Sequence, residues 1–276
     1  MGKFLNRYLN VISLSIVLQH LFGLILALVY PPTWFLFIGC IVSYVLRGLG
    51  VTIGYHRMLS HKAFEAHPIV EAVFTFLGAA ACQLSPISWA AVHRHHHKYS
   101  DTEHDWHAPA HKGFWYSHVG WIMDKDSIVQ NPDLWKSLND EYAPELYKNK
   151  IQLFFHKFHY IPPMLWAIAA FLIDGMAGFT WLFLISSIIT QNITWGIISV
   201  VHWFGYKHGV SEDTAKQSVI MAVLAFGEGW HENHHAYPND ARNGMRWYEF
   251  DLSYLIIKSL AKLGLIKNIR RLEVEL

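Results

Sequence analysis

The sequence predicts an all-α integral membrane protein, and three features support this fold class. Hydrophobic residues make up 53% of the 276 residues. Charged residues make up only 16%, well below the roughly 25% that is usual in soluble domains. The apolar residues are gathered in runs of about 20, the length that a helix needs to cross a bilayer. We therefore expect four transmembrane helices and a helical cap, forming a single domain over residues 1–276.

The first two spans are expected at residues 9–30 and 33–55. The first run is interrupted by only a few polar residues, such as Gln19 and His20, and the second carries the single charge of Arg47. The short turn "YPPT" between them predicts an antiparallel pair. No small-residue cleavage site follows the first run, which we interpret as an anchor and not as a signal peptide.

Two more spans are expected at residues 161–175 and 179–201, with the segment "DGMAG" as the hinge between them. Basic residues, among them Lys3, flank one end of the first pair, whereas its "YPPT" turn is uncharged. The positive-inside rule then places both termini and the cap, residues 56–160 and 202–276, on the cytoplasmic side.

Residues 68–89 are apolar enough to suggest another span, although Glu71 and Pro86 argue against it. A span here would put His93 on the opposite side of the membrane from His56 and His61. We therefore expect a buried or interfacial helix.

Histidine is the strongest anomaly of the composition, because its 19 residues almost match the 21 acidic residues. The net charge of +1 and the lack of a basic aromatic stripe give no indication of nucleic-acid binding. Cys40 and Cys82 form neither a disulfide framework nor a CxxC motif. Histidine is therefore the residue type that can carry chemistry here.

The histidines recur in four short motifs: "HRMLSH", "HRHHH", "VVHWFG" and "HENHH". Positions i, i+3 and i+4 of a helix share one face, and two motifs have this spacing. His95 lies on the opposite side of its helix. His56 and His61 are five apart, about 140° on an ideal helix, so one is expected to reach in from a fraying helix end. The candidate metal ligands are His56, His61, His93, His96, His97, His202, His231, His234 and His235.

Imidazole suits iron, zinc, copper and nickel, so the ligand type alone does not identify the metal. Nine rings exceed the needs of one ion but would serve two ions with four or five ligands each. A histidine such as His202, taken alone at a membrane boundary, is more often a polar cap than a ligand. Carboxylates that could support the ligands are Asp101, Glu103, Asp105, Glu228 and Glu232. Surface, helix-capping or ligand-supporting roles are expected for His20, His67, His104, His107, His111, His118, His156, His159 and His208.

The motifs "GYHRMLSH", "HRHHHKYSD" and "GEGWHENHH" resemble the three histidine boxes of the membrane-bound fatty acid desaturases, specifically the acyl-CoA (stearoyl-CoA) Δ9 branch. The stretches "GFWYSHVGW" and "NITWGIISVVHWFGY" are similar to that family too. The resemblance implies two iron ions held by the nine histidines, O2 as co-substrate and removal of two hydrogens from a saturated acyl chain. It implies no catalytic side chain beyond the metal ligands.

The resemblance also implies an acyl tunnel lined by Gln83, Trp89, Thr194 and Trp195, positions that would otherwise be read as ordinary packing. No haem, flavin or iron–sulfur motif is present in the sequence. A separate electron donor, such as ferredoxin, rubredoxin or cytochrome b5 with its reductase, is therefore expected.

The sequence departs from the family at four positions. Ile198 stands where the family has an asparagine that holds a water on one metal. Ala91 and Val92 replace a charged pair of the headgroup region, and Leu84 replaces an asparagine. An apolar rim suits an acyl chain presented by a phospholipid, although acyl-CoA or a carrier-protein thioester stay open.

Two other functions remain to be weighed. A membrane hydroxylase of alkanes, sterols or carotenoids uses similar histidine boxes, but the set of tunnel residues favours a desaturase. A metal transporter would place its ligands near the middle of the bilayer, whereas these motifs lie at the ends of the predicted spans.

Overall fold

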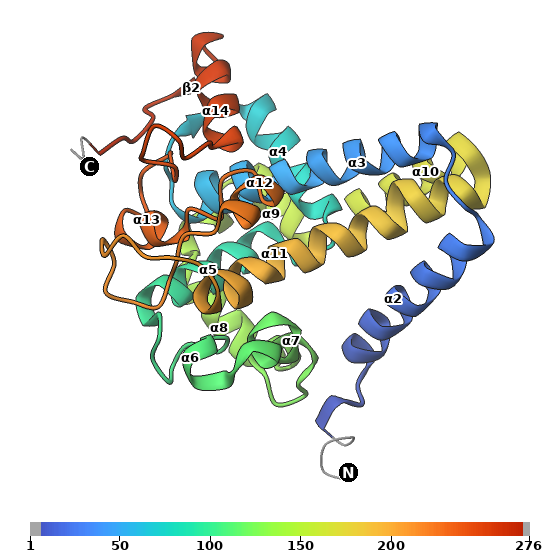
Figure 1. The fold of residues 1–276 in the computed structure, drawn as a ribbon, viewed down its shortest axis with the longest axis horizontal. Helices are drawn as coiled ribbons and strands as arrows, with labels where there is room; N and C mark the ends of the chain where they lie inside the picture. The colour runs from blue at the N-terminus through green and yellow to red at the C-terminus, as the bar shows by residue number, and fades with distance from the viewer. Residues whose placement is uncertain (1–6, 273–276) are drawn as a thin grey trace.

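The computed structural model describes residues 7–272, and it is almost entirely helical. Lys3, used above to orient the chain, lies outside the described residues. Long helices run side by side at one end of the molecule, the first of them diverges from the others, and shorter helices form a cap at the other end (Figure 1). Within residues 7–272, three helices are long and apolar enough to cross a membrane: Val11–Val29, Trp34–Ser60 and Ile161–Trp203.

Helix α2 (Val11–Val29) is apolar on all sides. It begins at Asn10, whose side chain accepts a hydrogen bond from the backbone of Ser13, and it ends before the pair of prolines in "YPPT". Large apolar side chains such as Leu24 and Leu28 are exposed along it. A helix that is apolar all round and exposed in this way is stable against lipid and not against water.

Helix α3 (Trp34–Leu49) continues without a break into η1 (Gly50–Ser60), which has π-helical hydrogen bonding. The second predicted span therefore extends beyond residue 55. The backbone N–H of His61 bonds to the carbonyl of His56 at 3.1 Å. Because a π-helix joins residues five apart, His56 and the C-cap residue His61 are brought onto one side of the helix. One histidine of the pair thus lies at a helix end, as expected, but its backbone hydrogen bond shows that this end is not frayed.

The 43-residue stretch Ile161–Trp203 consists of α10 (Ile161–Gly178), η5 (Phe179–Ile185) and α11 (Ser186–Trp203). Asp174 and Gly175 have non-helical dihedral angles, with φ of 50° at Gly175, a value that glycine adopts readily. The chain reverses there, so that α10 and α11 lie side by side (Figure 1). The indole N–H of Trp166 donates to the carbonyl of Leu182 at 3.1 Å, across the pair. This break lies within the predicted hinge.

Residues 68–89 form no continuous helix. Helix α4 (Pro68–Ala80) has 13 residues and is shorter than the three helices of residues 7–272 that could cross a membrane. A turn with positive φ at Cys82 and Leu84 leads into α5 (Pro86–Tyr99). The segment is thus a short helix packed against η1, followed by the start of the helix that carries "HRHHH".

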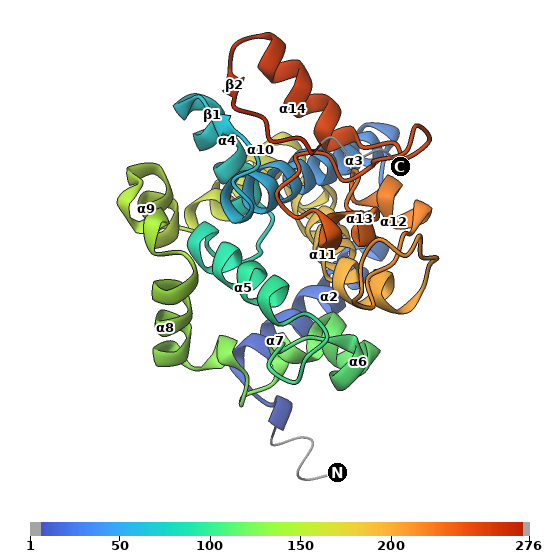
Figure 2. The ribbon, with the colours of Figure 1, turned by 90° about the vertical axis from the view of Figure 1, so that its left-hand side faces the viewer.

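The cap is built from short helices around a core in which Ile53, Ile87 and Ile257 are fully buried. Figure 2, seen from the cap end, shows α5 and α13 (His231–Ala236) beside the end of α11. The remaining elements are β1 (Glu65–Ala66), α6 (Pro109–Lys112), η2 (Tyr116–Gly120), α7 (Trp121–Met123), η3 (Ile128–Gln130), α8 (Pro132–Tyr142), η4 (Pro144–Lys148), α9 (Lys150–Lys157), α12 (Val219–Leu224), α13 (His231–Ala236), α14 (Leu252–Lys262) and β2 (Ile266–Lys267). Strands β1 and β2 pair antiparallel.

Candidate metal centre

All nine histidines predicted as ligands lie at the cap end of the long helices, and the structure brings them into two groups. The five-histidine group contains His56, His61, His93, His97 and His234. The four-histidine group contains His96, His202, His231 and His235. Within each group the potential ligand atoms lie within 4.8 Å of one another.

Helices α5 and α13 each contribute to both groups. On α5, His93 and His97 point into the five-histidine group and His96 into the other. Residues four apart share one face more closely than residues three apart, so the i, i+4 pair stays together. Helix α13 reverses the assignment: His231 and His235 enter the four-histidine group and His234 the five-histidine group.

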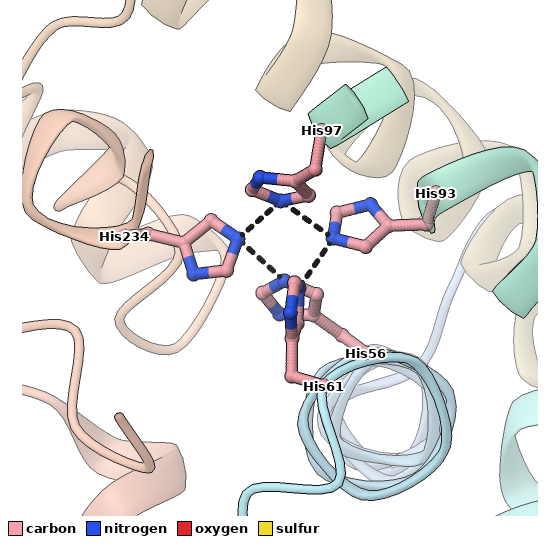
Figure 3. A group of neighbouring side chains, drawn as sticks. All are labelled: His56, His61, His93, His97 and His234. Carbon is pink, nitrogen blue, oxygen red and sulfur yellow. Dashed lines mark hydrogen bonds between the residues drawn. The ribbon is translucent and has the colours of Figure 1, made fainter. Parts of the chain in front are cut away.

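In the five-histidine group the Nε2 atoms point toward one another (Figure 3). The Nε2 atom of His234 lies 3.0 Å from that of His56 and 2.8 Å from that of His97. The Nε2 atom of His93 lies 2.7 Å from that of His61 and 3.1 Å from that of His97. These rings come from η1, α5 and α13, which are far apart in the sequence.

In the four-histidine group, too, ring nitrogens lie close to one another and are buried. The Nε2 atoms of His231 and His235 are 3.0 Å apart. The Nε2 atoms of His96 and His202 are buried without a hydrogen-bond partner. A buried, unpartnered polar nitrogen is costly, so these atoms fit a site that takes a ligand.

The outer nitrogens of several rings are held by acceptors. The Nδ1 atom of His56 lies 2.7 Å from Glu228, and that of His96 lies 2.8 Å from Asp105. His235 contacts Asp213 through Nδ1. These contacts place the proton on Nδ1 and leave the Nε2 lone pair directed inward, the arrangement that supports metal-binding histidines.

Of the carboxylates predicted to support the ligands, some lie beside the histidine rings and others do not. Asp105 and Glu228 contact the rings directly, and Asp101 accepts a hydrogen bond at 2.7 Å from Thr214, whose hydroxyl is 3.1 Å from Nδ1 of His202. Glu103 is exposed. Glu232 instead accepts hydrogen bonds from the backbone of residues 208–210. A ligand-supporting role for Glu103 and Glu232 is therefore not seen.

Asp213 and Thr214 were missed because they lie in the irregular segment after α11, without a motif. Only the fold brings this segment to the histidines. The nearest signal in the sequence is the cluster of acidic and hydroxyl residues in "SEDT".

Burial sets the protonation of most of these rings. Burial, followed by repulsion between neighbouring imidazoles, lowers the pKa of six of them well below the usual value, namely His61, His93, His97, His231, His234 and His235. Although burial opposes it, the Asp105 carboxylate raises the pKa of His96. Neutral imidazole is the form that binds a metal.

The donor set fits metal ions. Imidazole nitrogens that face one another at 2.7 to 3.1 Å either share a hydrogen bond, for which one ring must carry its proton on Nε2, or are ligands of one cation. An imidazole nitrogen binds zinc at about 2.0–2.1 Å, so two such ligands on one ion are about 3 Å apart. The observed separations match this requirement. The two groups could therefore each hold a metal ion.

His95 stays outside both groups. Its ring stacks on Trp106, with centroids 3.8 Å apart and planes inclined by 6°. Burial lowers its pKa to about 4. The position agrees with the helix-face argument, which placed His95 opposite the candidate ligands.

A further histidine, His107, lies beside the four-histidine group. Its Nδ1 atom is 3.0 Å from Asp105, and its ring centroid is 4.9 Å from that of His96. Together His96, Asp105 and His107 form a third group of potential ligand atoms among the described residues. The sequence left the role of His107 open between surface, capping and ligand support, and the structure favours the last.

A cavity of about 390 Å³ leads from the histidines into the bundle of long helices. His56, His93 and His231 line it at one end, and α2 contributes Ile12, Ser15, Ile16 and Gln19. Its wall also contains the four residues predicted for an acyl tunnel: Gln83, Trp89, Thr194 and Trp195. The structure thus brings these four residues together, and their role stays a prediction.

The positions that depart from the expected headgroup region are not all at a surface. Ala91 is fully buried in the core of the cap, so it cannot contact a headgroup. Val92 and Leu84 line the cavity, and so does Ile198. Ala91 therefore cannot be part of an apolar rim, and a rim formed by Leu84 and Val92 stays a prediction.

Long apolar helices, a cavity among them and two buried groups of imidazoles define a membrane-type helical protein with a site for metal ions. The sequence matches the fatty acid desaturase family over residues 32–265. The chain belongs to that family and is an oxidoreductase of the fatty acid desaturase class. This confirms the family and enzyme class that the histidine boxes indicated.

The relatives include enzymes named for different acyl carriers. The chain is 35% identical to an sn-1 stearoyl-lipid 9-desaturase of Synechocystis sp., over 82% of this chain and 69% of that protein. It is 34% identical to a chloroplastic palmitoyl-monogalactosyldiacylglycerol delta-7 desaturase of Arabidopsis thaliana, over 82% of this chain and 60% of that protein. It is 33% identical to an icosanoyl-CoA 5-desaturase of Limnanthes douglasii, over 83% of this chain and 64% of that protein. The chain thus spans less than two thirds of the length of the latter two.

Proposed function

We propose that the protein introduces a double bond, at Δ9, into a saturated fatty acyl chain at a centre of two iron ions. The observation that carries this proposal is the pair of histidine groups at the end of a cavity lined by Gln83, Trp89, Thr194 and Trp195. Two bound iron ions with O2 as co-substrate would supply the oxidising power to remove two hydrogens from adjacent methylenes. The nine histidines are the proposed ligands.

The protein itself holds the iron ions, positions the acyl chain and excludes water from the site. The six rings whose pKa burial lowers bind iron without a competing proton, and Glu228, Asp105 and Asp213 fix the ring orientations. The cavity wall positions the reacting methylenes and keeps water out. Two further electrons per turnover come from a separate donor protein such as ferredoxin, rubredoxin or cytochrome b5 with its reductase.

Fatty-acid methyl-ester analysis of a host expressing the protein tests the proposal. A new monounsaturated acid with the double bond at carbon nine is the expected product. An alcohol would instead identify a membrane hydroxylase of alkanes, sterols or carotenoids. A metal transporter is disfavoured because the histidine groups lie at the ends of the long helices and not at their middle.

We further propose that the substrate is an acyl chain linked to a phospholipid. Leu84 and Val92 line the cavity with apolar surface, where the phosphates of coenzyme A would require cations. Acyl-lipid and acyl-CoA desaturases both occur among the relatives, so the test must separate them. After a pulse of labelled saturated chains, the first labelled unsaturated species should be a lipid. Early appearance in the CoA thioester would contradict this.

In the bilayer we propose four spans, with the cap and both termini on the cytoplasmic side. The break at Asp174 and Gly175 divides Ile161–Trp203 into two antiparallel spans, and α2 with α3 supplies the other pair. All nine candidate ligand histidines then lie on one side of the membrane. Accessibility of single cysteines in α8 and in the "YPPT" turn to an impermeant thiol reagent, in sealed cells, would test the orientation. Only the turn should react from outside.

Trp195→Ala is expected to leave the iron content unchanged and to lower turnover or scatter the double-bond position. The indole lines the cavity, so its removal leaves the acyl chain room to slide. The measurement is the isomer distribution of the product, together with iron per chain. Trp247→Ala is the matched control, since Trp247 is 93% exposed. A wild-type rate and product from Trp195→Ala would refute the tunnel assignment.

Ile198→Asn is expected to keep both iron ions bound. Ile198 lines the cavity, and asparagine is no larger, so its amide can be solvated there without displacing the histidines. Iron content by elemental analysis is the measurement, with Ile220→Asn, at a position 73% exposed, as control. Loss of one iron from Ile198→Asn alone would mean that the four-histidine group requires an apolar neighbour.

A further inference from the structure

Inside the bundle, a chain of hydrogen bonds joins α2, η2 and α11. The amide nitrogen of Asn192 lies 2.9 Å from Nε2 of His20, and its oxygen lies 3.3 Å from Nε2 of His118. The hydroxyl of Ser199 lies 2.8 Å from Nδ1 of His118. His20 is in the middle of a candidate membrane span, where polar and ionisable side chains are rare and commonly functional.

Donors and acceptors in this network match when both rings are neutral. The Nδ1–H of His20 donates to the carbonyl of Ile16 at 2.8 Å, which leaves Nε2 to accept from Asn192. The Nε2–H of His118 donates to Asn192, and its Nδ1 accepts the one hydroxyl hydrogen of Ser199, which the carbonyl of Trp195 would otherwise take. Burial lowers the pKa of His118, in keeping with a neutral ring. Each imidazole thus uses one donor and one acceptor.

The rings of both histidines lie near the indole of Trp195. The ring of His20 is roughly parallel to the indole, at a centroid distance of 6.4 Å and an angle of 25°. The ring of His118 is perpendicular to it, at 5.9 Å and 87°. The hydroxyl of Ser199 is also 3.2 Å from the carbonyl oxygen of Trp195. The network therefore lies beside a residue that lines the cavity.

Attachment of α2 to the bundle does not depend on these histidines. Gln19 donates to Gln191 at 3.0 Å, and Gly23 allows close approach of Ile188. At its start, α2 is held by the side chain of Ser13, which donates to the carbonyl of Met123 at 2.7 Å. What the histidine network adds is two hydrogen-bonded rings, held by one amide, beside the indole of Trp195.

We propose that His20, Asn192 and His118 are positioning residues that fix the orientation of the Trp195 ring. In this way they determine which pair of methylenes lies beside the histidine groups. This inference rests on the proposed desaturase function. It assigns a role to "GFWYSHVGW", which carries His118, and to the polar interruption of the first span, which the metal centre leaves unexplained.

The test replaces each imidazole by a somewhat larger aromatic ring that cannot form hydrogen bonds. His118→Phe and His20→Phe keep an aromatic ring and remove its hydrogen bonds, whereas His118→Gln keeps a donor for Asn192. The matched control is His159→Phe, at an exposed histidine. Each variant is purified with iron, its iron content is measured, and its products are separated by double-bond position.

In His118→Phe and His20→Phe we expect a roughly tenfold rise in the ratio of displaced to normal isomers, the discrimination that one buried hydrogen bond can provide. Iron content should equal that of the wild type. His118→Gln should restore most of the wild-type distribution, and His159→Phe should not alter it. An unchanged distribution in both phenylalanine variants overturns the proposal, and so does loss of iron, because the network would then act through the metal centre.

A second readout does not depend on activity. In protein labelled with fluorotryptophan, the fluorine NMR resonance of Trp195 is identified by its absence in Trp195→Phe. This resonance should broaden or split in His118→Phe and stay single in His159→Phe. A single, unshifted resonance in His118→Phe overturns the proposal. If the wild type forms no double bond at all, the proposed function fails, while this measurement still reports whether the network holds Trp195.

Discussion

His96→Ala, in the four-histidine group, is expected to abolish desaturation and to lower the iron content. His234→Ala, in the five-histidine group, is expected to have the same two effects. Removing a residue that merely supports a metal ligand typically costs about 10–100-fold in affinity or activity, so loss of a ligand itself should exceed this. His96 contributes a buried, unpartnered Nε2 atom to the four-histidine group. Iron per chain by elemental analysis and desaturated product in the same preparation are the measurements.

The neighbouring residue provides a matched control. His95→Ala makes the same substitution one position earlier on α5, at a ring that stacks on Trp106 outside both groups. It should retain both irons and most of the activity, at a stability cost of about 0.5–1.5 kcal/mol for the lost aromatic pair. If His95→Ala lost iron as readily as His96→Ala, the division of α5 into a ligand face and a packing face would be incorrect.

The candidate ligands could be found from the sequence because residues three or four apart lie on the same face of a straight α-helix. His93, His96 and His97 are brought to one side of α5 by spacing alone, and His231, His234 and His235 to one side of α13. Their division between two groups could not be found in this way. It depends on where α13 and the end of α11 meet α5, which is decided by packing between distant segments.

Helical periodicity also failed where the helix is not an α-helix. His56 and His61 are poorly aligned at 100° per residue, yet η1 brings their ring centroids to 4.8 Å. No feature of the sequence "GVTIGYHRMLS" predicts that this segment forms a π-helix. Conversely, the reversal within residues 161–203 was predictable, because "DGMAG" offers a glycine for the positive φ at the break.

Arg57→Met is expected to lower the free energy of unfolding by about 3–5 kcal/mol, the range for breaking a buried ion pair by removal of one partner. Arg57 is 1% exposed. It donates to Glu228 at 2.9 and 3.1 Å, and to Asp251 at 2.9 Å. Methionine fills much of the space but leaves both carboxylates without their cation. Since Glu228 also holds Nδ1 of His56, iron content should fall as well.

Thermal unfolding of the detergent-solubilised protein, followed by the loss of its monodisperse peak on size-exclusion chromatography, measures this effect. Lys136→Met is the control, because Lys136 and Asp140 form an exposed pair that should contribute no more than about 1 kcal/mol. Adding Glu228→Gln and Asp251→Asn to Arg57→Met should recover part of the stability, since neutral amides tolerate burial better than unpaired carboxylates. Iron binding should not recover, because the acceptor for His56 is altered. Equal midpoints for Arg57→Met and Lys136→Met would show that the buried network contributes no more than an ion pair in water.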